Sequence, residues 1–381
     1  SKYLTDIYFD LDEGDELFVG DDAFSGCTAL KSLTIPARYT TFSPEVLGDN
    51  ASIENITVAE DHETYSSVSG LLCNKDGDTL IYCPAGRRGA LRIPAGIRSI
   101  ASGAFKNCAN LTSVTIPSFV MRIEDKAFEN CTRLTSVTFA GGNALGSKLS
   151  VGEKVFLNCT SLSKVSFEEN SNVVALGDGT FSGCSKITSI KLPATLQQVS
   201  ARLFDGCANL VTIEVDAKSE YLSAEDNILY NKDRTRMIYY SVSKTDSVLV
   251  LPESLETIDA NLFKDNVTIE KVVFGKNVKE IGESAFENCA NLMSIVFVDG
   301  GENELVIGDR AFASCSALMD IYVASSAEDS EDDYESGTPA NLRKIGAYAF
   351  TEAQFGGTLA LSEESLKSAF QKAREDETVG I

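Results

Sequence analysis

Ten cysteines are the residues of this chain whose type and spacing could most readily do chemistry, as metal ligands, redox thiols or disulfide partners. Eight of them follow a phenylalanine by three positions: Cys27, Cys108, Cys131, Cys159, Cys184, Cys207, Cys289 and Cys315. Asparagine takes the same place at Asn50 and Asn266, which a series of obligate disulfide partners would not easily allow. The pattern therefore predicts buried, reduced thiols, because free cysteine is among the most buried residue types.

The other residues with catalytic potential form no known constellation. Cys73 and Cys83 lie on either side of a predicted hairpin, and a disulfide between them stays open as an alternative. His62 is the only histidine, so an HExxH zinc site is excluded, and a Ser-His or Cys-His dyad would need a nucleophile to meet the polar loop AEDHETY. The chain has no GxSxG elbow and no evident glycosidase-like pair of carboxylates. We therefore predict no enzyme activity, no metal site and no cofactor.

The charge of the chain limits its partners. The 381 residues include 56 acidic and 33 basic side chains, which gives a net charge of −23. No cluster of lysine and arginine offsets the negative electrostatic field of these charges. Because such a field repels a phosphate backbone, nucleic acid and anionic membrane surfaces are excluded as partners. No apolar run approaches the roughly 20 residues of a membrane span, so we also predict no direct membrane insertion. The chain begins at Ser1 rather than Met, which is typical of a mature or trimmed segment.

A repeat organises the cysteines and most of the chain. Phe105, Cys108 and Val114 recur 23 residues later as Phe128, Cys131 and Val137, and a unit reads IGxxAFxxCxxLxxVxIP. The first apolar residue of each FxxC-like pattern anchors one of eleven units: Phe24, Leu47, Phe105, Phe128, Phe156, Phe181, Phe204, Phe263, Phe286, Phe312 and Phe350. The alternating VxI part favours a strand, and apolar residues three apart in AFxxCxxL favour a helical or 3₁₀ turn. We therefore predict an α/β repeat solenoid, in which every coil buries its apolar side chains against the next.

The predicted solenoid covers residues 17–361 in about 11–13 coils. Residues 1–16 are expected to form an N-terminal cap or a truncated coil, and residues 362–381 a C-terminal amphipathic helix and tail. Two longer inserts, GLLCNKDGDTLIYCP at 70–84 and NILYNKDRTRMIYYS at 227–241, each read as an extra hairpin coil that continues the sheet.

The segment from Ser325 to Asn341 is strongly acidic and lacks the apolar anchors of the repeat. Its composition predicts a mobile loop. A calcium site at residues 325–340 stays open as an alternative, although the carboxylates do not follow the spacing of an EF-hand loop.

The full unit between Ile100 and Ile123 resembles the BspA-like (treponemal-type) leucine-rich repeat, and the two hairpin inserts look like a variant found in the same family. The resemblance implies a secreted or cell-surface protein of a host-associated bacterium, and it supplies no catalytic residues. It also implies adhesion, by a monomer, to a protein ligand such as an extracellular-matrix or bacterial surface protein. Two alternatives remain: a structural spacer that displays another domain, and a carbohydrate-binding module, although the chain has no Trp on which a sugar would stack.

The middle residue of each VxI strand should point away from the core. It is a hydroxyl residue in the first units, as at Thr115 and Thr138, and an apolar or aromatic residue at Val273, Val296 and Tyr322. Exposed apolar patches often mark contacts, so these last three residues are the predicted protein-binding strip. The alternative is that the acidic segment or the C-terminal helix folds over them.

Overall fold

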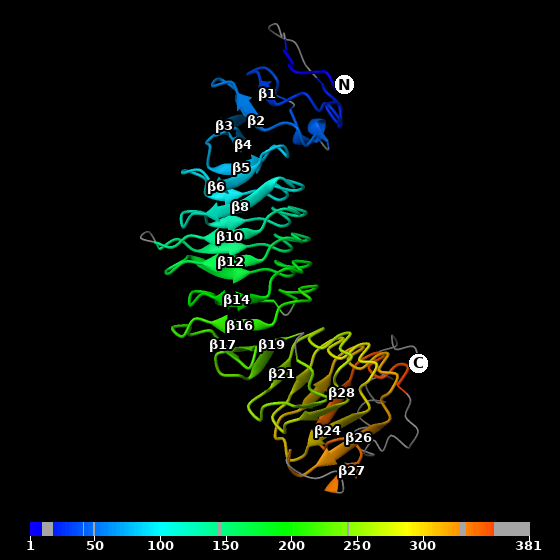
Figure 1. The fold of residues 1–381 in the computed structure, drawn as a ribbon. Coiled ribbons are helices and arrows are strands. Elements are labelled where there is room, and N and C mark those ends of the chain that lie inside the picture. Colours follow the sequence, from blue (N-terminus) through cyan, green and yellow to red (C-terminus); the bar gives the residue numbers. More distant parts are fainter. Residues whose placement is uncertain are drawn as a thin grey trace. The chain divides into compact units, whose positions relative to one another are not determined.

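The structure, a computed structural model, consists almost entirely of short β-strands. It describes residues 1–9, 18–40, 42–48, 50–142, 146–200, 202–241, 244–327 and 333–353. These form two compact units, Ser1–Ser219 and Glu220–Ile381 (Figure 1). Within each unit most coils place one strand in each of two sheets, so each unit is a β-solenoid of stacked coils. We call the sheet of VxI strands the VxI sheet and the other the second sheet.

In the first unit the VxI sheet has three sections. They are β1 (Ser32–Ile35) with β2 (Asn55–Val58); β6 (Gly89–Arg92), β8 (Leu111–Ile116), β10 (Ser136–Phe139) and β12 (Lys164–Phe167); and β14 (Ser189–Leu192) with β16 (Thr212–Val215). The second sheet has eight strands: β3 (Tyr65–Val68), β4 (Leu71–Asn74), β5 (Thr79–Tyr82), β7 (Ser99–Ile100), β9 (Arg122–Ile123), β11 (Leu149–Val151), β13 (Val173–Leu176) and β15 (Gln198–Val199). Successive coils pair in parallel, with Val114 opposite Val137 and Val137 opposite Val165.

The second unit repeats this arrangement. Its VxI sheet contains β20 (Val248–Val250), β22 (Lys271–Phe274), β24 (Ser294–Val298), β26 (Asp320–Ala324) and β27 (Glu335–Ser336). Its second sheet contains β17 (Leu222–Glu225), β18 (Ile228–Asn231), β19 (Arg236–Tyr240), β21 (Thr257–Ile258), β23 (Glu280–Ile281), β25 (Leu305–Ile307) and β28 (Leu342–Ile345). All pairs are parallel except the hairpin strands and β27, which runs antiparallel to β26.

The two sequence inserts form hairpins, as predicted. β4 pairs antiparallel with β5, and β5 then pairs in parallel with β7. In the second unit β18 pairs antiparallel with β19, which pairs in parallel with β21. Each hairpin therefore continues the second sheet of its own unit.

Ladders of identical side chains form the core. The rings of Phe105 and Phe128 stack with centroids 4.4 Å apart, and those of Phe263 and Phe286 with centroids 4.6 Å apart. Phe128 is fully buried. Burial of one such side chain stabilises the fold by about 1.5–3 kcal/mol, so the repeated apolar positions explain why the coils stack.

The prediction of helical turns, and with it the α/β class, is wrong. The one helix that lies wholly within the described residues is a 3₁₀ turn, η1 (Pro44–Leu47). In the AFxxC segment the N–H groups of Phe105 and Asn107 donate to Ala127 O and Glu129 O of the next coil, at 2.7 and 2.9 Å, while intervening N–H groups bond within the turn. Asn107 has φ +62°, a left-handed conformation that interrupts a right-handed helix. The AFxxC segments therefore form a stack of turns, here called the turn stack.

The predicted ends of the chain are described only in part. Phe9 packs its ring 5.2 Å from that of Tyr39, beside the first coil. Residues 10–17 lie outside the described residues, and so do residues 354–381, which include the predicted C-terminal helix.

Candidate functional site

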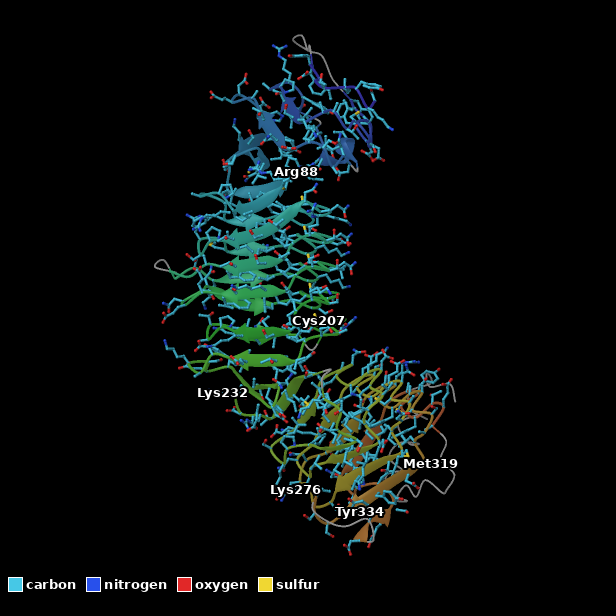
Figure 2. All side chains as sticks on the ribbon, viewed as in Figure 1. Arg88, Cys207, Lys232, Lys276, Met319 and Tyr334 are labelled. Atoms are coloured by element: carbon cyan, nitrogen blue, oxygen red, sulfur yellow. The ribbon has the colours of Figure 1, made fainter. Side chains whose placement is uncertain are left out.

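The FxxC cysteines form a column of buried thiols beside the phenylalanine ladder (Figure 2, where Cys207 is labelled). Cys131 Sγ donates to Phe105 O at 3.1 Å, and Cys159 Sγ donates to Phe128 O at 3.2 Å. Burial raises the pKa of Cys207 to about 12. A protonated thiol whose hydrogen is used in a hydrogen bond is a poor nucleophile and a poor metal ligand. The column is therefore structural.

All ten cysteines are free and buried, as the repeat pattern predicted for eight of them. Cys73 and Cys83 form no disulfide, so that alternative does not describe the structure. Burial raises the pKa of the Cys73 thiol to about 11.

Asn50 explains how asparagine can replace cysteine in this column. Its Nδ2 donates to Phe24 O at 2.8 Å, which is the bond that the thiols make in other coils, and it also donates to Cys27 O at 3.3 Å. Asn266 follows a hairpin coil and acts differently, because its Oδ1 accepts from the N–H groups of Thr268 and Ile269, both at 2.9 Å. At this position of the repeat, cysteine and asparagine both form hydrogen bonds to backbone groups. This supports the interpretation that the position is structural rather than a thiol site.

His62 is a structural residue in this fold. It is fully buried, although the sequence placed it in a polar loop. Its Nδ1 accepts from the N–H groups of Thr64 and Tyr65, both at 3.1 Å, and its Nε2 lies 3.2 Å from Tyr39 O. Both ring nitrogens are thus occupied by backbone groups, with the proton assigned to Nε2.

No metal centre is evident within the part of the chain that the structure describes, because no three His, Cys, Asp or Glu side chains gather there. The acidic segment is described except for residues 328–332, so calcium binding in residues 325–340 stays an alternative. None of the helical segments among the described residues has the length and apolar character of a membrane span.

The predicted strip occupies neighbouring strands. Val273 lies opposite Val296, and Val296 lies opposite Tyr322, on β22, β24 and β26. The side chains do point away from the main core, but only 2% of Val273 and 0% of Val296 is exposed, and Tyr322 is half-buried. The expected exposure of the two valines is therefore wrong.

Tyr334 and β27 (Glu335–Ser336), which belong to the acidic segment and are here called the strap, cover the strip. Ser336 of β27 pairs with Tyr322, and the ring of Tyr334, which is labelled in Figure 2, lies 5.7 Å from the Tyr322 ring. Lys271 places its Nζ 4.7 Å from the centroid of the Tyr334 ring. The alternative in which the acidic segment folds over the strip is thus the one that the structure adopts. Val273 and Val296 are unavailable to a partner while this strap is in place.

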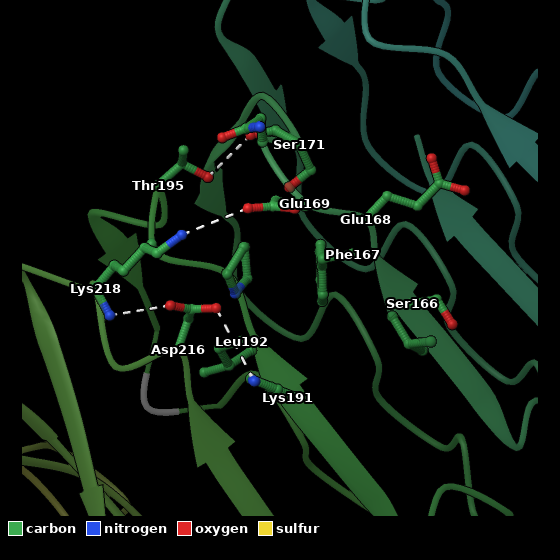
Figure 3. Close-up of a pocket in the computed structure, with 14 residues that line it drawn as sticks. Ser166, Phe167, Glu168, Glu169, Ser171, Lys191, Leu192, Thr195, Asp216 and Lys218 are labelled. Atoms are coloured by element: carbon green, nitrogen blue, oxygen red, sulfur yellow. Dashed lines mark hydrogen bonds and ion pairs between the residues drawn. The ribbon is translucent and has the colours of Figure 1, made fainter. Parts of the chain in front are cut away.

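A crevice opens between β12 and β14 of the first unit (Figure 3). β12 and β14 follow each other in the stack, yet among the described residues no backbone hydrogen bond pairs them, while β13 and β15 of the same coils remain paired. The resulting cavity has a volume of about 480 Å³ and is lined by β12, β14, the loops that follow them, and Asp216 and Lys218 in the loop that follows β16. The VxI sheet is therefore interrupted at this point, while the second sheet on the other side of the same coils stays continuous.

An aromatic ring and two ion pairs line this crevice. Phe167 is half-buried and stacks on Phe139 of the preceding coil with ring centroids 4.9 Å apart. At the rim Lys218 Nζ lies 3.4 Å from Glu169 Oε1, and Lys191 Nζ lies 4.0 Å from Asp216 Oδ2. Exposed ion pairs of this kind contribute about 0–1 kcal/mol each. The rim charges can therefore exchange their partners for those of a ligand at little cost.

The sequence contained only a weak signal for the crevice. Pro193 lacks the N–H that Asp216, its counterpart in the next coil, donates to Leu192 O at 2.9 Å. Pro117 stands at the same place, and there β6 and β8 remain paired. Proline alone therefore does not predict the break.

Comparisons with known proteins agree with this architecture. The family model of the BspA type leucine rich repeat region matches six copies, over residues 15–72, 89–210, 149–247 and 235–353. No curated protein sequence matches the chain. Among solved structures, the pneumococcal vaccine antigen PcpA is similar, with a TM-score of 0.50 and 17% identity over 81% of this chain and 94% of that one.

A leucine rich cell surface protein from Faecalibacterium prausnitzii is also similar, with a TM-score of 0.43 and 22% identity over 81% of this chain and 98% of that one. The similarity to PcpA concerns the fold alone. The family model, in contrast, covers most of the described repeat, including the phenylalanine ladder and the cysteine column. The chain therefore belongs to the BspA-type leucine-rich repeat family.

Proposed function

We propose that this protein is a non-enzymatic recognition protein, secreted or held at the cell surface, that binds a partner protein through the VxI sheet of its first unit. The observation that carries the proposal is the crevice between β12 and β14. It is a concave site of about 480 Å³ with an aromatic wall and charges of both signs at its rim. Such a mixture of apolar and polar groups is typical of a binding site.

The surroundings of the crevice support a protein ligand. Thr115 and Thr138 lie opposite each other and are half-buried, so a regular polar surface extends from the crevice along the sheet. A flat polar surface beside one concave anchor point matches the core-and-rim organisation of protein interfaces. Adhesion to an extracellular-matrix or bacterial surface protein is the form of recognition that we expect from the family.

Carbohydrate binding is the second candidate, because Phe167 offers a half-buried ring inside the crevice. A sugar would stack on this ring and accept hydrogen bonds from Lys191 or Lys218. We rank it below protein binding, since the ring is the only aromatic side chain among the residues that line the cavity.

Immobilised arrays test the proposal. The full chain is applied to extracellular-matrix proteins, bacterial surface proteins and glycans, beside the variant Lys191→Glu with Lys218→Glu. The control variant, Lys31→Glu with Lys186→Glu, makes the same charge change at exposed lysines away from the crevice. We expect binding to a protein that the crevice variant loses and the control keeps. Binding to glycans alone would support the second candidate, and a chain that binds nothing on either array, or a crevice variant that binds normally, would contradict the proposal.

A further inference from the structure

The turn stack of the first unit is interrupted where the first hairpin coil enters it. In regular coils the carbonyl groups of one turn accept N–H groups from the preceding turn, as in Gly103 N to Asp125 O at 3.2 Å and Asn107 N to Glu129 O at 2.9 Å. The hairpin coil has no AFxxC segment, and its chain passes directly from β5 through Pro84 toward β6. The turn stack therefore lacks a complete turn in the hairpin coil, on the side of the Phe105 turn that faces the preceding coil.

The missing layer leaves hydrogen-bond acceptors without donors. In the turn that follows the hairpin, Ala104 O accepts from Cys83 N at 2.7 Å. Ser102 O and Lys106 O occupy the places of Asp125 O and Glu129 O, but within the described part of the chain no N–H group donates to either. Backbone carbonyls normally find a partner in protein or water, so these two are ready to accept from a ligand.

A cavity of about 600 Å³ occupies the place of the missing layer, and we call it the notch. Ala51, Ala101 and the ring of Tyr82 contribute its apolar wall, and Glu45 contributes an exposed carboxylate. All of these residues belong to the first unit. The notch is lined by turn-stack and hairpin residues, so it is separate from the crevice in the VxI sheet.

The polar groups of the notch are predominantly acceptors. The Tyr82 hydroxyl has no hydrogen-bond partner among the described residues, and burial raises the pKa of Tyr82, so the hydroxyl stays neutral. The Lys106 ammonium group, the one cation that lines the notch, forms an ion pair at 3.0 Å with Glu129 of the following coil. The carboxylate of Glu45 adds a negative charge to a chain that already carries a net charge of −23.

We propose that the notch binds an arginine side chain presented by a peptide segment of a partner. The guanidinium group carries five N–H donors in one plane and a permanent positive charge, which matches a carboxylate and two free carbonyl groups. Its apolar stem suits the wall formed by Ala51, Ala101 and Tyr82. This site goes beyond the proposed recognition through the VxI sheet and does not depend on it.

Titration of the full chain with acetyl-Gly-Arg-Gly-amide tests the proposal. The measurement is a dissociation constant from isothermal titration calorimetry at low salt. A second peptide replaces arginine by citrulline, which has nearly the same shape but no charge. We expect the arginine peptide to bind at least about tenfold more tightly, because charge-assisted hydrogen bonds are roughly twice as strong as neutral ones.

Variants of the chain locate the site. Glu45→Gln should weaken binding of the arginine peptide about five- to tenfold, whereas Glu63→Gln, which removes the charge of another exposed glutamate outside the notch, should leave the affinity unchanged. Ala51→Leu should fill the notch from an exposed position and abolish binding without a change in the core. Equal affinities for the two peptides, or normal binding to the Glu45→Gln or Ala51→Leu variant, would overturn the proposal.

Discussion

Glu287 joins three successive coils in the turn stack of the second unit. Its carboxylate lies 2.9 Å from Lys264 Nζ of the preceding coil and forms an ion pair with Arg310 of the following coil. Only 12% of the Glu287 side chain is exposed. Hydrogen bonds from Arg310, Lys264 and Ser284 lower the pKa of Glu287 to about 2. The ionised carboxylate should therefore stabilise the folded state.

The variant Glu287→Gln keeps the shape of this side chain and removes its charge. A fall in pKa from 4.5 to about 2 corresponds to roughly 3.4 kcal/mol, at about 1.36 kcal/mol per pKa unit. Solvent screens the partners, whose side chains are 38% exposed in Lys264 and 47% exposed in Arg310. We therefore expect the variant to lose about 1–2 kcal/mol of unfolding free energy at pH 7.

The effect of Glu287 should depend on pH in a defined direction. The pKa of the folded state lies below that of the unfolded state, so the stabilisation is complete above about pH 4.5 and disappears as the pH falls through about 2. At pH 3 about two fifths of it should remain. The difference between wild type and Glu287→Gln should shrink accordingly.

Urea unfolding followed by circular dichroism at pH 7, 5 and 3 measures this difference. Glu283→Gln is the matched control, because Glu283 is an exposed carboxylate in the same turn; its effect should stay below about 0.5 kcal/mol. A Glu287→Gln variant that behaves like this control at pH 7 would refute the reasoning, and so would a difference that is the same at pH 7 and pH 3.

Three further predictions concern the thiols, a second ion pair and the strap. Unreduced protein should show ten reactive thiols in denaturant and almost none when folded; fewer than ten in denaturant would reveal a disulfide. Arg236→Ala should lower the unfolding free energy by about 1–3 kcal/mol, because Arg236 forms two hydrogen bonds to the carboxylate of Asp259, and only 8% of Asp259 is exposed. An unchanged midpoint of urea unfolding would contradict this prediction. Tyr334→Ala should uncover Val296 and raise the fluorescence of a dye that binds apolar surface, whereas unchanged fluorescence would show that Tyr334 is not the cover.

The stacked coils were predictable because their side chains repeat at a fixed period. Phe105 and Phe128 occupy equivalent places in successive coils, so one ring must stack on the next in any solenoid that keeps its core closed. The hairpins at β4–β5 and β18–β19 were predictable for a similar reason, since each insert contains two apolar runs around a turn.

The conformation of the turn stack was not predictable from apolar spacing alone. Apolar residues three apart suit a helix, but Asn107 and Asn130 adopt φ values of +62° and +61° and direct alternate N–H groups to the next coil. Asn130 Nδ2 also donates to Asn107 Oδ1 at 3.1 Å. The recurrent asparagine before cysteine was the available signal, because asparagine tolerates the left-handed region better than most residues.

The candidate sites depend on irregularities that a repeat pattern does not show. The alternation of the VxI strand correctly placed Val296 on the outward face, but the cover over it comes from Tyr334, in a segment without repeat anchors. The crevice arises from the absent pairing between β12 and β14, and the notch arises from a layer that the hairpin omits. Both sites arise because a contact between neighbouring coils is absent, and no single residue in the sequence marks that absence.

Hydrogen–deuterium exchange of the full chain, alone and with the protein that binds it most tightly on the arrays, tests the proposed recognition most directly. The account predicts slower exchange on binding in β12 and β14 and in the loops that follow them, at residues 164–171 and 189–195. Protection confined to the second unit, or exchange at the crevice that is the same with and without the partner, would contradict recognition through the VxI sheet of the first unit.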